Sequence, residues 1–164
     1  MATLEFGETS IKDPIEIANL LADEGILYER WGTKPEDYPD DAAVLKAYAP
    51  EVDNLKKRGK YVQADLVALN PDTPDLENIC ANFIKEHHHE DDEVRFVVEG
   101  SGVFEVLSQK DDSRIKISTE PGDLVVIPAK RRHLFYLTQQ RTIRCIRLFK
   151  NSKGWEAIYT KPKS

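Results

Sequence analysis

The sequence has 164 residues, of which 40% are hydrophobic and 32% are charged, and its formal net charge at pH 7 is −6. This length suits one domain with a single core, and the composition excludes a disordered tail. The negative charge gives no electrostatic support to the binding of nucleic acid or of anionic membranes.

The sequence contains no apolar run near the roughly 20 residues that cross a bilayer. Its first residues, MATLEFGETSIKD, lack the basic and apolar regions of a signal peptide. We therefore expect a cytoplasmic protein without a membrane or nucleic-acid partner. We also expect a monomer, because no obvious apolar strip suggests an interface.

The two cysteines, Cys80 and Cys145, both lie in apolar stretches of the sequence. Their spacing excludes a CxxC zinc site. A disulfide between them is the alternative, but a reducing compartment favours two buried free thiols.

The first part of the chain, after residue 12, is predicted to be mostly helical. Asp13 is a candidate N-cap, Pro14 suits the first position of a helix, and Gly25 would end that helix. Two further helices are expected over 41–49 and 50–59, the second of which begins at a proline and ends at a glycine.

The remainder of the chain is predicted to form a β-barrel, apart from a helix near 74–83. Short β-rich segments with Gly and Pro between them are typical of a small barrel or sandwich. The expected strands are 61–69, 94–107 with a Gly-Ser-Gly turn at 100–102, 114–119, 124–128, 133–138 and 142–149. The predicted fold is therefore α+β, with a helical part of about 13–60 and a barrel of about 61–160 within one domain, 1–164.

The densest group of coordinating side chains in the sequence is the segment EHHHEDDEVRF. Alternate residues of a strand face the same side, so His87 and His89 point together and His88 points away. Glu93 shares their parity, and His133, the remaining histidine, stands at the start of another predicted strand. Imidazole and carboxylate ligands suit iron, nickel, manganese or zinc. The alternative interpretation is a solvated polar loop.

The spacing of these residues resembles the two cupin motifs. The pattern H-x-H-x3-E-x6-G is followed by G-x5-P-x4-H, and the matching residues are His87, His89, Glu93 and Gly100, and then Gly122, Pro128 and His133. Two positions depart from the usual motifs, because Ala81 and Lys130 stand where glycine is usual. Lysine tolerates positive φ poorly, so we expect Lys130 to change the shape of the turn before His133.

Longer segments resemble the acireductone dioxygenase family. They are FIKEHHHEDDEVRFVVEGSGVFEV, PGDLVVIPAKRRH and IRLFKNSKGWEA, with GILYERW and LENICANFIKEH nearer the N-terminus. The resemblance implies a cupin-type double-stranded β-barrel, or jelly roll, with peripheral helices mostly from the N-terminal half. It also implies one Fe(II) or Ni(II) ion per chain, held by His87, His89, Glu93 and His133.

The family's reaction, which the resemblance implies here, is the cleavage of acireductone by O2 in methionine salvage. Acireductone is 1,2-dihydroxy-3-keto-5-methylthiopentene. With Fe(II) the products are 4-methylthio-2-oxobutanoate and formate, and with Ni(II) they are 3-methylthiopropanoate, formate and carbon monoxide. Two alternatives stay open: another metal-dependent cupin oxygenase or isomerase, and a cupin that binds a metal or ligand without catalysis.

Two arginines are candidate catalytic residues. Arg95 shares the strand parity of Glu93, and Arg147 shares a predicted inward face with Ile143 and Cys145. A buried charge is costly without a partner, so each arginine is either part of a structural ion pair or a fixed cation for a substrate enolate. Both positions match arginines that the family uses near its substrate.

Five further residues are candidates with more than one possible role each. Phe83, Phe135 and Trp155 either pack in the core or, as the family resemblance implies, form an apolar pocket for the methylthio group. Asp92, a candidate catalytic residue, and Glu86 flank the predicted ligands. Each could orient an imidazole ring, act as a base, or be a solvated surface charge.

Overall fold

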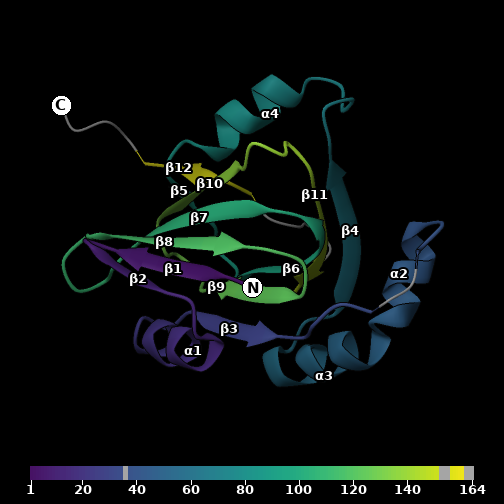
Figure 1. The fold of residues 1–164 in the computed structure, drawn as a ribbon, viewed down its shortest axis with the longest axis horizontal. Helices are drawn as coiled ribbons and strands as arrows, with labels where there is room; N and C mark the ends of the chain where they lie inside the picture. The colour runs from purple at the N-terminus through teal and green to yellow at the C-terminus, as the bar shows by residue number, and fades with distance from the viewer. Residues whose placement is uncertain (35–36, 152–155, 161–164) are drawn as a thin grey trace.

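The computed structural model describes residues 1–34, 37–151 and 156–160, which form two antiparallel sheets with helices outside them (Figure 1). The seven-stranded sheet contains, in spatial order, β12 (Ile158–Tyr159), β5 (His87–His88), β10 (His133–Leu137), β7 (Gly102–Leu107), β8 (Arg114–Thr119), β1 (Thr3–Phe6) and β2 (Thr9–Ile11). The five-stranded sheet contains β3 (Leu27–Arg30), β9 (Asp123–Ile127), β6 (Glu93–Gly100), β11 (Ile143–Phe149) and β4 (Gln63–Leu69). The predicted α+β jelly roll is confirmed.

The helices are α1 (Pro14–Asp23), α2 (Asp41–Ala47), α3 (Ala49–Gly59) and α4 (Leu76–Phe83). The Asp13 side chain accepts a hydrogen bond from the Ile15 N–H at 3.2 Å, as an N-cap does. Gly25 follows α1 with a φ of 73°, which glycine adopts without strain. These predicted helix boundaries are confirmed, whereas the strand β3 lies within the part of the chain that was predicted to be mostly helical.

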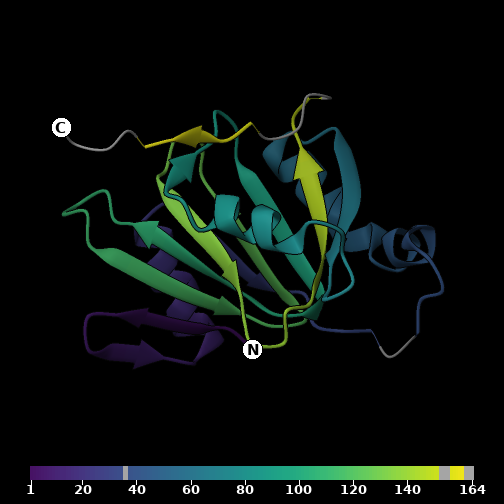
Figure 2. The same ribbon diagram turned by 90° about the horizontal axis from the view of Figure 1, so that it is seen from above.

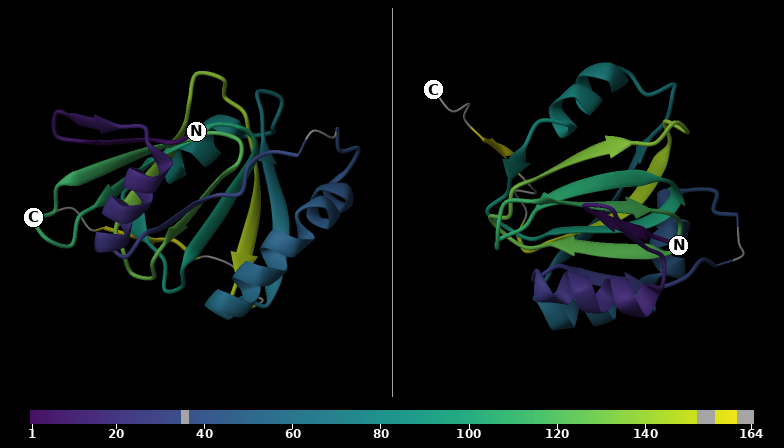
Figure 3. Two further views of the ribbon diagram at one scale, coloured as in Figure 1. Left: turned by 60° about the horizontal axis from the view of Figure 1, so that its bottom comes forward. Right: turned by 60° about the vertical axis from the view of Figure 1, so that its left-hand side comes forward.

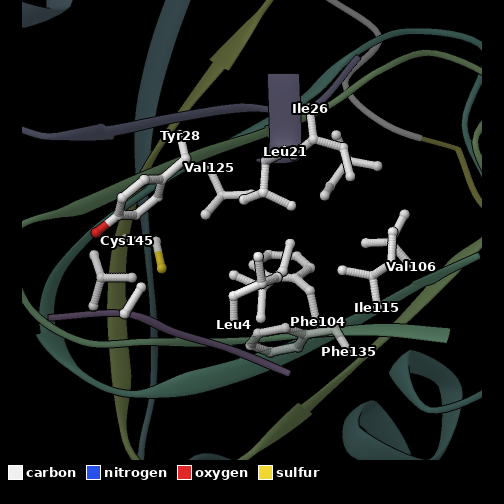
Figure 4. Packing of buried hydrophobic residues seen from close by; sticks show 14 of the residues in the cluster. Leu4, Leu21, Ile26, Tyr28, Phe104, Val106, Ile115, Val125, Phe135 and Cys145 are labelled. Atoms are coloured by element: carbon white, nitrogen blue, oxygen red, sulfur yellow. The ribbon is translucent and has the colours of Figure 1, made fainter. Parts of the chain in front are cut away.

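One core lies between the two sheets and is shown in Figure 4. Leu4 of β1, Phe104 of β7 and Phe135 of β10 come from one sheet, and Val125 of β9 and Cys145 of β11 come from the other. All five are at least 97% buried. Each Å² of apolar surface buried stabilises a protein by about 25 cal/mol, so such a core is the main stabilising contribution in a domain. It fills the barrel beside the cavity described below.

A second core lies on the outer face of the five-stranded sheet, under α2 and α3. On β6, Val94, Phe96 and Val98 pack in this core, while Val97 belongs to the core between the sheets. The Phe96 ring lies 4.8 Å from that of Tyr48, which ends α2. Both faces of β6 are thus covered, and its alternate residues are fixed in direction.

The helices cover different sides of the barrel. Figure 3 shows α1 and α4 on opposite sides of the sheets, and Figure 2 shows α4 between β10 and β11 as seen from above. Within the described residues no helix is long and apolar enough to cross a membrane. Both cysteines are free, as predicted, although Cys80 on α4 is only partly buried.

Candidate metal centre and cavity

Three histidines meet where β5 lies beside β10. His87 and His133 are directly opposite each other in this antiparallel pair, and His89 follows β5. The ring centroids lie 4.6 Å apart for His87 and His133, 5.0 Å for His87 and His89, and 5.4 Å for His89 and His133. One ring nitrogen of each histidine lies within 4.8 Å of those of the other two. His88 points away and its side chain is 27% exposed, so the predicted orientations are confirmed.

Main-chain carbonyl groups fix the tautomer of each ring. The Nδ1 atoms lie 2.7 Å from the Lys85 oxygen for His87, 2.9 Å from the Glu156 oxygen for His89, and 2.9 Å from the Arg131 oxygen for His133. A carbonyl only accepts hydrogen bonds, so each Nδ1 carries a proton and donates it. Each Nε2 then points into the shared space, where it presents a lone pair whenever the ring is neutral, as the metal-binding histidines of proteins do.

Glu93 completes a set of four donor groups. Its Oε2 lies 2.7 Å from Nε2 of His133 and its Oε1 lies 3.9 Å from Nε2 of His89. Burial opposes a charge on Glu93, but attraction to Arg95 and His133 prevails and holds the pKa of Glu93 below its usual range. Among the described residues, neither Glu93 Oε2 nor His133 Nε2 forms a well-oriented hydrogen bond. A cation fits such facing acceptor atoms.

Burial also favours the neutral, metal-binding form of two of the rings. It lowers the pKa of His87 and of His89 from the ordinary value of 6.5. Their imidazoles are therefore neutral at pH 7, with Nε2 able to coordinate a metal ion.

The metal centre borders a cavity of about 290 Å³. The lining comes from β4, β6, β10, β11, β12, α4 and the segment around β5. The described residues that line it are Val67, Leu69, Ile79, Asn82, Phe83, His87, His89, Glu93, Arg95, Phe135, Ile143, Arg147, Ala157 and Tyr159. Most of these side chains are apolar, so the cavity combines a charged centre with hydrophobic walls.

Arg95 is both an ion-pair partner and a cavity residue. Its side chain is 8% exposed, and Nε and Nη2 each lie 3.1 Å from Glu93 Oε1. The guanidinium carbon lies 5.9 Å from the centre of the Phe83 ring and 5.4 Å from that of Phe135. The predicted inward orientation is confirmed, and the cation is fixed beside the metal centre by three neighbours.

Arg147 reaches the same cavity from the neighbouring strand. It is paired with Arg95 in the register of β11 and β6. Its Nε and Nη2 donate to the two carboxylate oxygens of Asp65 at 2.8 and 2.7 Å. Its side chain is 28% exposed, so it lies at a more open part of the wall than Arg95.

The predicted aromatic residues differ in outcome. Phe83 and Phe135 line the cavity and make an edge-to-face contact, with ring centroids 5.8 Å apart. Phe135 also belongs to the core between the sheets, so it both packs in the core and lines the cavity. Trp155 lies outside the described residues.

Neither flanking carboxylate is among the described residues that line the cavity. Asp92 accepts hydrogen bonds from the Ala129 N–H at 3.0 Å and the Tyr61 hydroxyl at 2.9 Å. A carboxylate oxygen of Glu86 lies 3.7 Å from Arg132 Nη1. The structure therefore does not bring either group to the cavity, and Asp92 instead connects the loop after His89 to the turn before His133.

Lys130 in that turn has a φ of 68°. Its N–H donates to the His89 carbonyl oxygen at 2.7 Å. The prediction that lysine would change the turn is wrong in this respect, because Lys130 adopts the left-handed conformation that glycine favours. The conformation costs on the order of 1 kcal/mol, which the hydrogen bond to a ligand-bearing segment helps to offset.

Sequence reasoning missed several cavity residues. Ile79 and Phe83 are four residues apart on α4, which places both on one helix face, and this spacing could have indicated Ile79. Tyr159 lies on the two-residue strand β12, directly opposite His87. So short a strand has no period to detect, and no sequence signal pointed to Tyr159.

Comparison with known proteins gives a consistent result. A model of the ARD/ARD' family matches residues 7–157. The acireductone dioxygenase of Sulfurihydrogenibium sp. (strain YO3AOP1) is 43% identical, over 97% of this chain and 94% of that protein. That of Bacillus cereus (strain ATCC 10987 / NRS 248) is 37% identical, over 92% of this chain and 94% of that protein.

A solved structure agrees with these relatives. It is the acireductone dioxygenase from Bacillus anthracis with a cadmium ion in its active center, which aligns with a TM-score of 0.89 and 36% identity, over 97% of this chain and 98% of that chain. The chain therefore belongs to the acireductone dioxygenase (ARD/ARD') family, and its three-histidine centre is a metal-binding site.

Proposed function

We propose that this protein is a metal-dependent dioxygenase that cleaves acireductone with O2 in methionine salvage. The proposal rests on the arrangement of the metal-binding groups and the two arginines around one cavity. Three imidazole Nε2 atoms and the Glu93 carboxylate converge at the wall of a mostly apolar cavity, and Arg95 and Arg147 also line it.

The proposed metal ligands are His87, His89, Glu93 and His133. An Fe(II) or Ni(II) ion, one per chain, would supply Lewis acidity and reactivity toward O2. The chain's own contribution is to hold the four donors in place and keep the imidazoles in the correct tautomer.

The cavity residues would bind and orient the substrate. The guanidinium cation of Arg95 can stabilise an enolate oxygen next to the metal centre. Arg147 supplies a second cation at the more open part of the wall. Val67, Leu69 and Ile79 offer an apolar surface that suits a methylthio group. We assign no general base, because Asp92 and Glu86 contact other groups.

We further propose that the metal decides the products. With Fe(II) they would be 4-methylthio-2-oxobutanoate and formate, and with Ni(II) they would be 3-methylthiopropanoate, formate and carbon monoxide. Intrinsic affinity favours nickel over iron, whereas availability decides which ion the protein carries in the cell. We also propose that the enzyme works as a cytoplasmic monomer, and sedimentation equilibrium tests the oligomeric state.

Oxygen uptake with synthetic acireductone tests the proposed reaction. Metal-free protein is loaded anaerobically with Fe(II) or Ni(II) and then mixed with substrate in an oxygen electrode. We expect uptake only when metal, substrate and protein are all present, and His133→Ala is the matched control. Substrate conversion without oxygen uptake would indicate an isomerase. No conversion by a protein that has bound metal would indicate a binding protein without this activity.

A further inference from the structure

Arg131, two residues before His133 in the sequence, forms a buried ion pair with Glu24 outside the cavity. Arg131 and Glu24 have side chains that are 4% and 10% exposed. Arg131 Nη1 lies 3.5 Å from Glu24 Oε2, and Nη2 donates to the Glu24 carbonyl oxygen. Neither residue is among the described residues that line the cavity of the metal centre.

Glu24 is in turn fixed by two other elements. It caps the C-terminal end of α1, where its N–H bonds the last turn of the helix. Its carboxylate accepts hydrogen bonds from the Ser108 hydroxyl and, at 3.3 Å, from the Gln109 N–H. Both of these residues directly follow β7. The Arg131 side chain is therefore held between α1 and the end of β7.

The main chain of Arg131 contacts a metal ligand. Its carbonyl oxygen accepts the Nδ1–H of His133 at 2.9 Å. Residues 128–132 belong to no strand, so sheet hydrogen bonds do not hold this carbonyl group in place. The Arg131 N–H bonds only within the turn, to the Pro128 oxygen at 3.2 Å. The neighbouring residues are held by main-chain hydrogen bonds, from the Lys130 N–H to the His89 oxygen at 2.7 Å and from the Leu107 N–H to the Arg132 oxygen at 3.0 Å. The buried side chain anchors Arg131 itself to the end of α1.

Burying two charges is costly, and an apolar pair of similar size would often be as stable. A charged pair also fixes the orientation of its groups through directional hydrogen bonds, which an apolar pair cannot do. We propose that the Glu24–Arg131 pair is a positioning device for the metal centre. It holds the Arg131 carbonyl where it fixes the tautomer and direction of the His133 ring.

This inference rests on the metal site of the proposed function and not on its substrate. The test therefore uses Ni²⁺ alone, with its dissociation constant measured by competition with a chromogenic chelator. We expect Arg131→Met to weaken Ni²⁺ binding about 10- to 100-fold, which is the usual effect of losing a group that orients a ligand. Glu24→Gln, which keeps the side-chain shape, should weaken binding in the same direction, and Arg131→Lys should restore part of it.

A matched control removes a comparable ion pair elsewhere. Arg30 donates to Asp123 at 2.9 Å, and Asp123 is fully buried at the end of β9 that is remote from Pro128. Arg30→Met should lower the melting temperature and leave Ni²⁺ affinity unchanged. In the metal-free protein, the His133 Nδ1–H should exchange with solvent faster in Arg131→Met than in Arg30→Met.

The outcomes separate the inference from the proposed function. If Arg131→Met and Glu24→Gln lower the melting temperature but bind Ni²⁺ like the wild type, the ion pair is only structural and the inference is wrong. If Arg131→Met does not fold, Glu24→Gln decides by the same measurement. If the wild type itself binds no Ni²⁺, the metal site fails, and with it the proposed function.

Discussion

At the scale of single residues, main-chain carbonyl groups determine how the imidazole rings face the metal centre. The three carbonyls come from Lys85, Arg131 and Glu156, which lie in three different segments. Side-chain identity alone does not reveal such contacts, so the sequence predicted which histidines point inward and not what orients them.

The ligand assignment makes a prediction about five single substitutions. His87→Ala, His89→Ala, Glu93→Ala and His133→Ala should each sharply lower metal content, because each removes one of four converging donors. His88→Ala is the control, since its side chain faces away from the site. Metal analysis of the purified variants tests this, and loss of metal in His88→Ala with retention in His87→Ala would contradict the assignment.

The two cavity arginines should affect the reaction and not the metal content. Arg95→Leu and Arg147→Leu should retain metal but lower kcat/KM roughly ten- to hundredfold, since a charge-assisted bond is worth about 1.5–3 kcal/mol. Arg144→Leu is the control, because Arg144 on the same strand pairs with Asp41 of α2, 3.0 Å away. Wild-type kcat/KM in both cavity variants would show that these arginines have only structural roles.

At the scale of elements, the long strands were predictable and the short ones were not. Alternation and turn residues predicted β6 to β11, because each has one or two faces buried in a core. The strands β1, β2, β3, β5 and β12 have two to four residues each, which is too few for a period. They form through pairing with neighbours, so only the folded chain defines them.

Contacts between elements also determine the partners of two site candidates, which the sequence did not predict. Arg147 faces the cavity as its strand parity predicted, but its pairing with Asp65 depends on β4 lying beside β11. Asp92 is next to Glu93 in the sequence, yet its carboxylate contacts Tyr61 and Ala129. Proximity in the sequence therefore correctly predicted that His87, His89 and Glu93 lie close together, but it gave no reliable guide to a base.

One contact between elements predicts a pH-dependent stability. Arg58 of α3 donates to both carboxylate oxygens of Glu29 on β3, at 2.8 and 2.9 Å. This contact, helped by the Trp31 hydrogen bond, lowers the pKa of Glu29 below its ordinary value of 4.5, although burial opposes the shift. Because the folded-state pKa is the lower one, the stabilisation is present above the unfolded-state pKa and is lost as the pH falls through the folded-state pKa.

Arg58→Met should therefore lower the free energy of unfolding at pH 7, by up to about 1 kcal/mol for a partly exposed pair. The difference from wild type should be smaller at about pH 2.5, because this stabilisation is lost as the pH falls through the folded-state pKa of Glu29. Urea unfolding at the two pH values measures this. In a Glu29→Gln background, which serves as the control, Arg58→Met should change the free energy of unfolding equally at both pH values. An effect of Arg58→Met in the wild-type background that does not depend on pH would contradict the account.

At the scale of the whole molecule, the five-stranded sheet separates two environments. Its outer face packs against α2 and α3, and its inner face supplies Glu93, Arg95 and Arg147 to the cavity. The opposite sheet supplies His87 and His133, and His89 directly follows its strand β5. The helix α4 and the strand β12 complete the cavity walls. The family motifs could predict which side chains converge, whereas the cavity depends on packing between segments far apart in the sequence.

The central claim is that this one centre performs metal-dependent cleavage of acireductone. Its most direct test is product analysis of a single metal-free preparation, divided and refilled anaerobically with Fe(II) or Ni(II), with gas chromatography for carbon monoxide after addition of substrate and O2. We predict keto acid and formate without carbon monoxide from the Fe(II) sample, and methylthiopropanoate, formate and carbon monoxide from the Ni(II) sample. Equal carbon monoxide from both samples, or no oxygen uptake by either metal-loaded sample, would contradict the account.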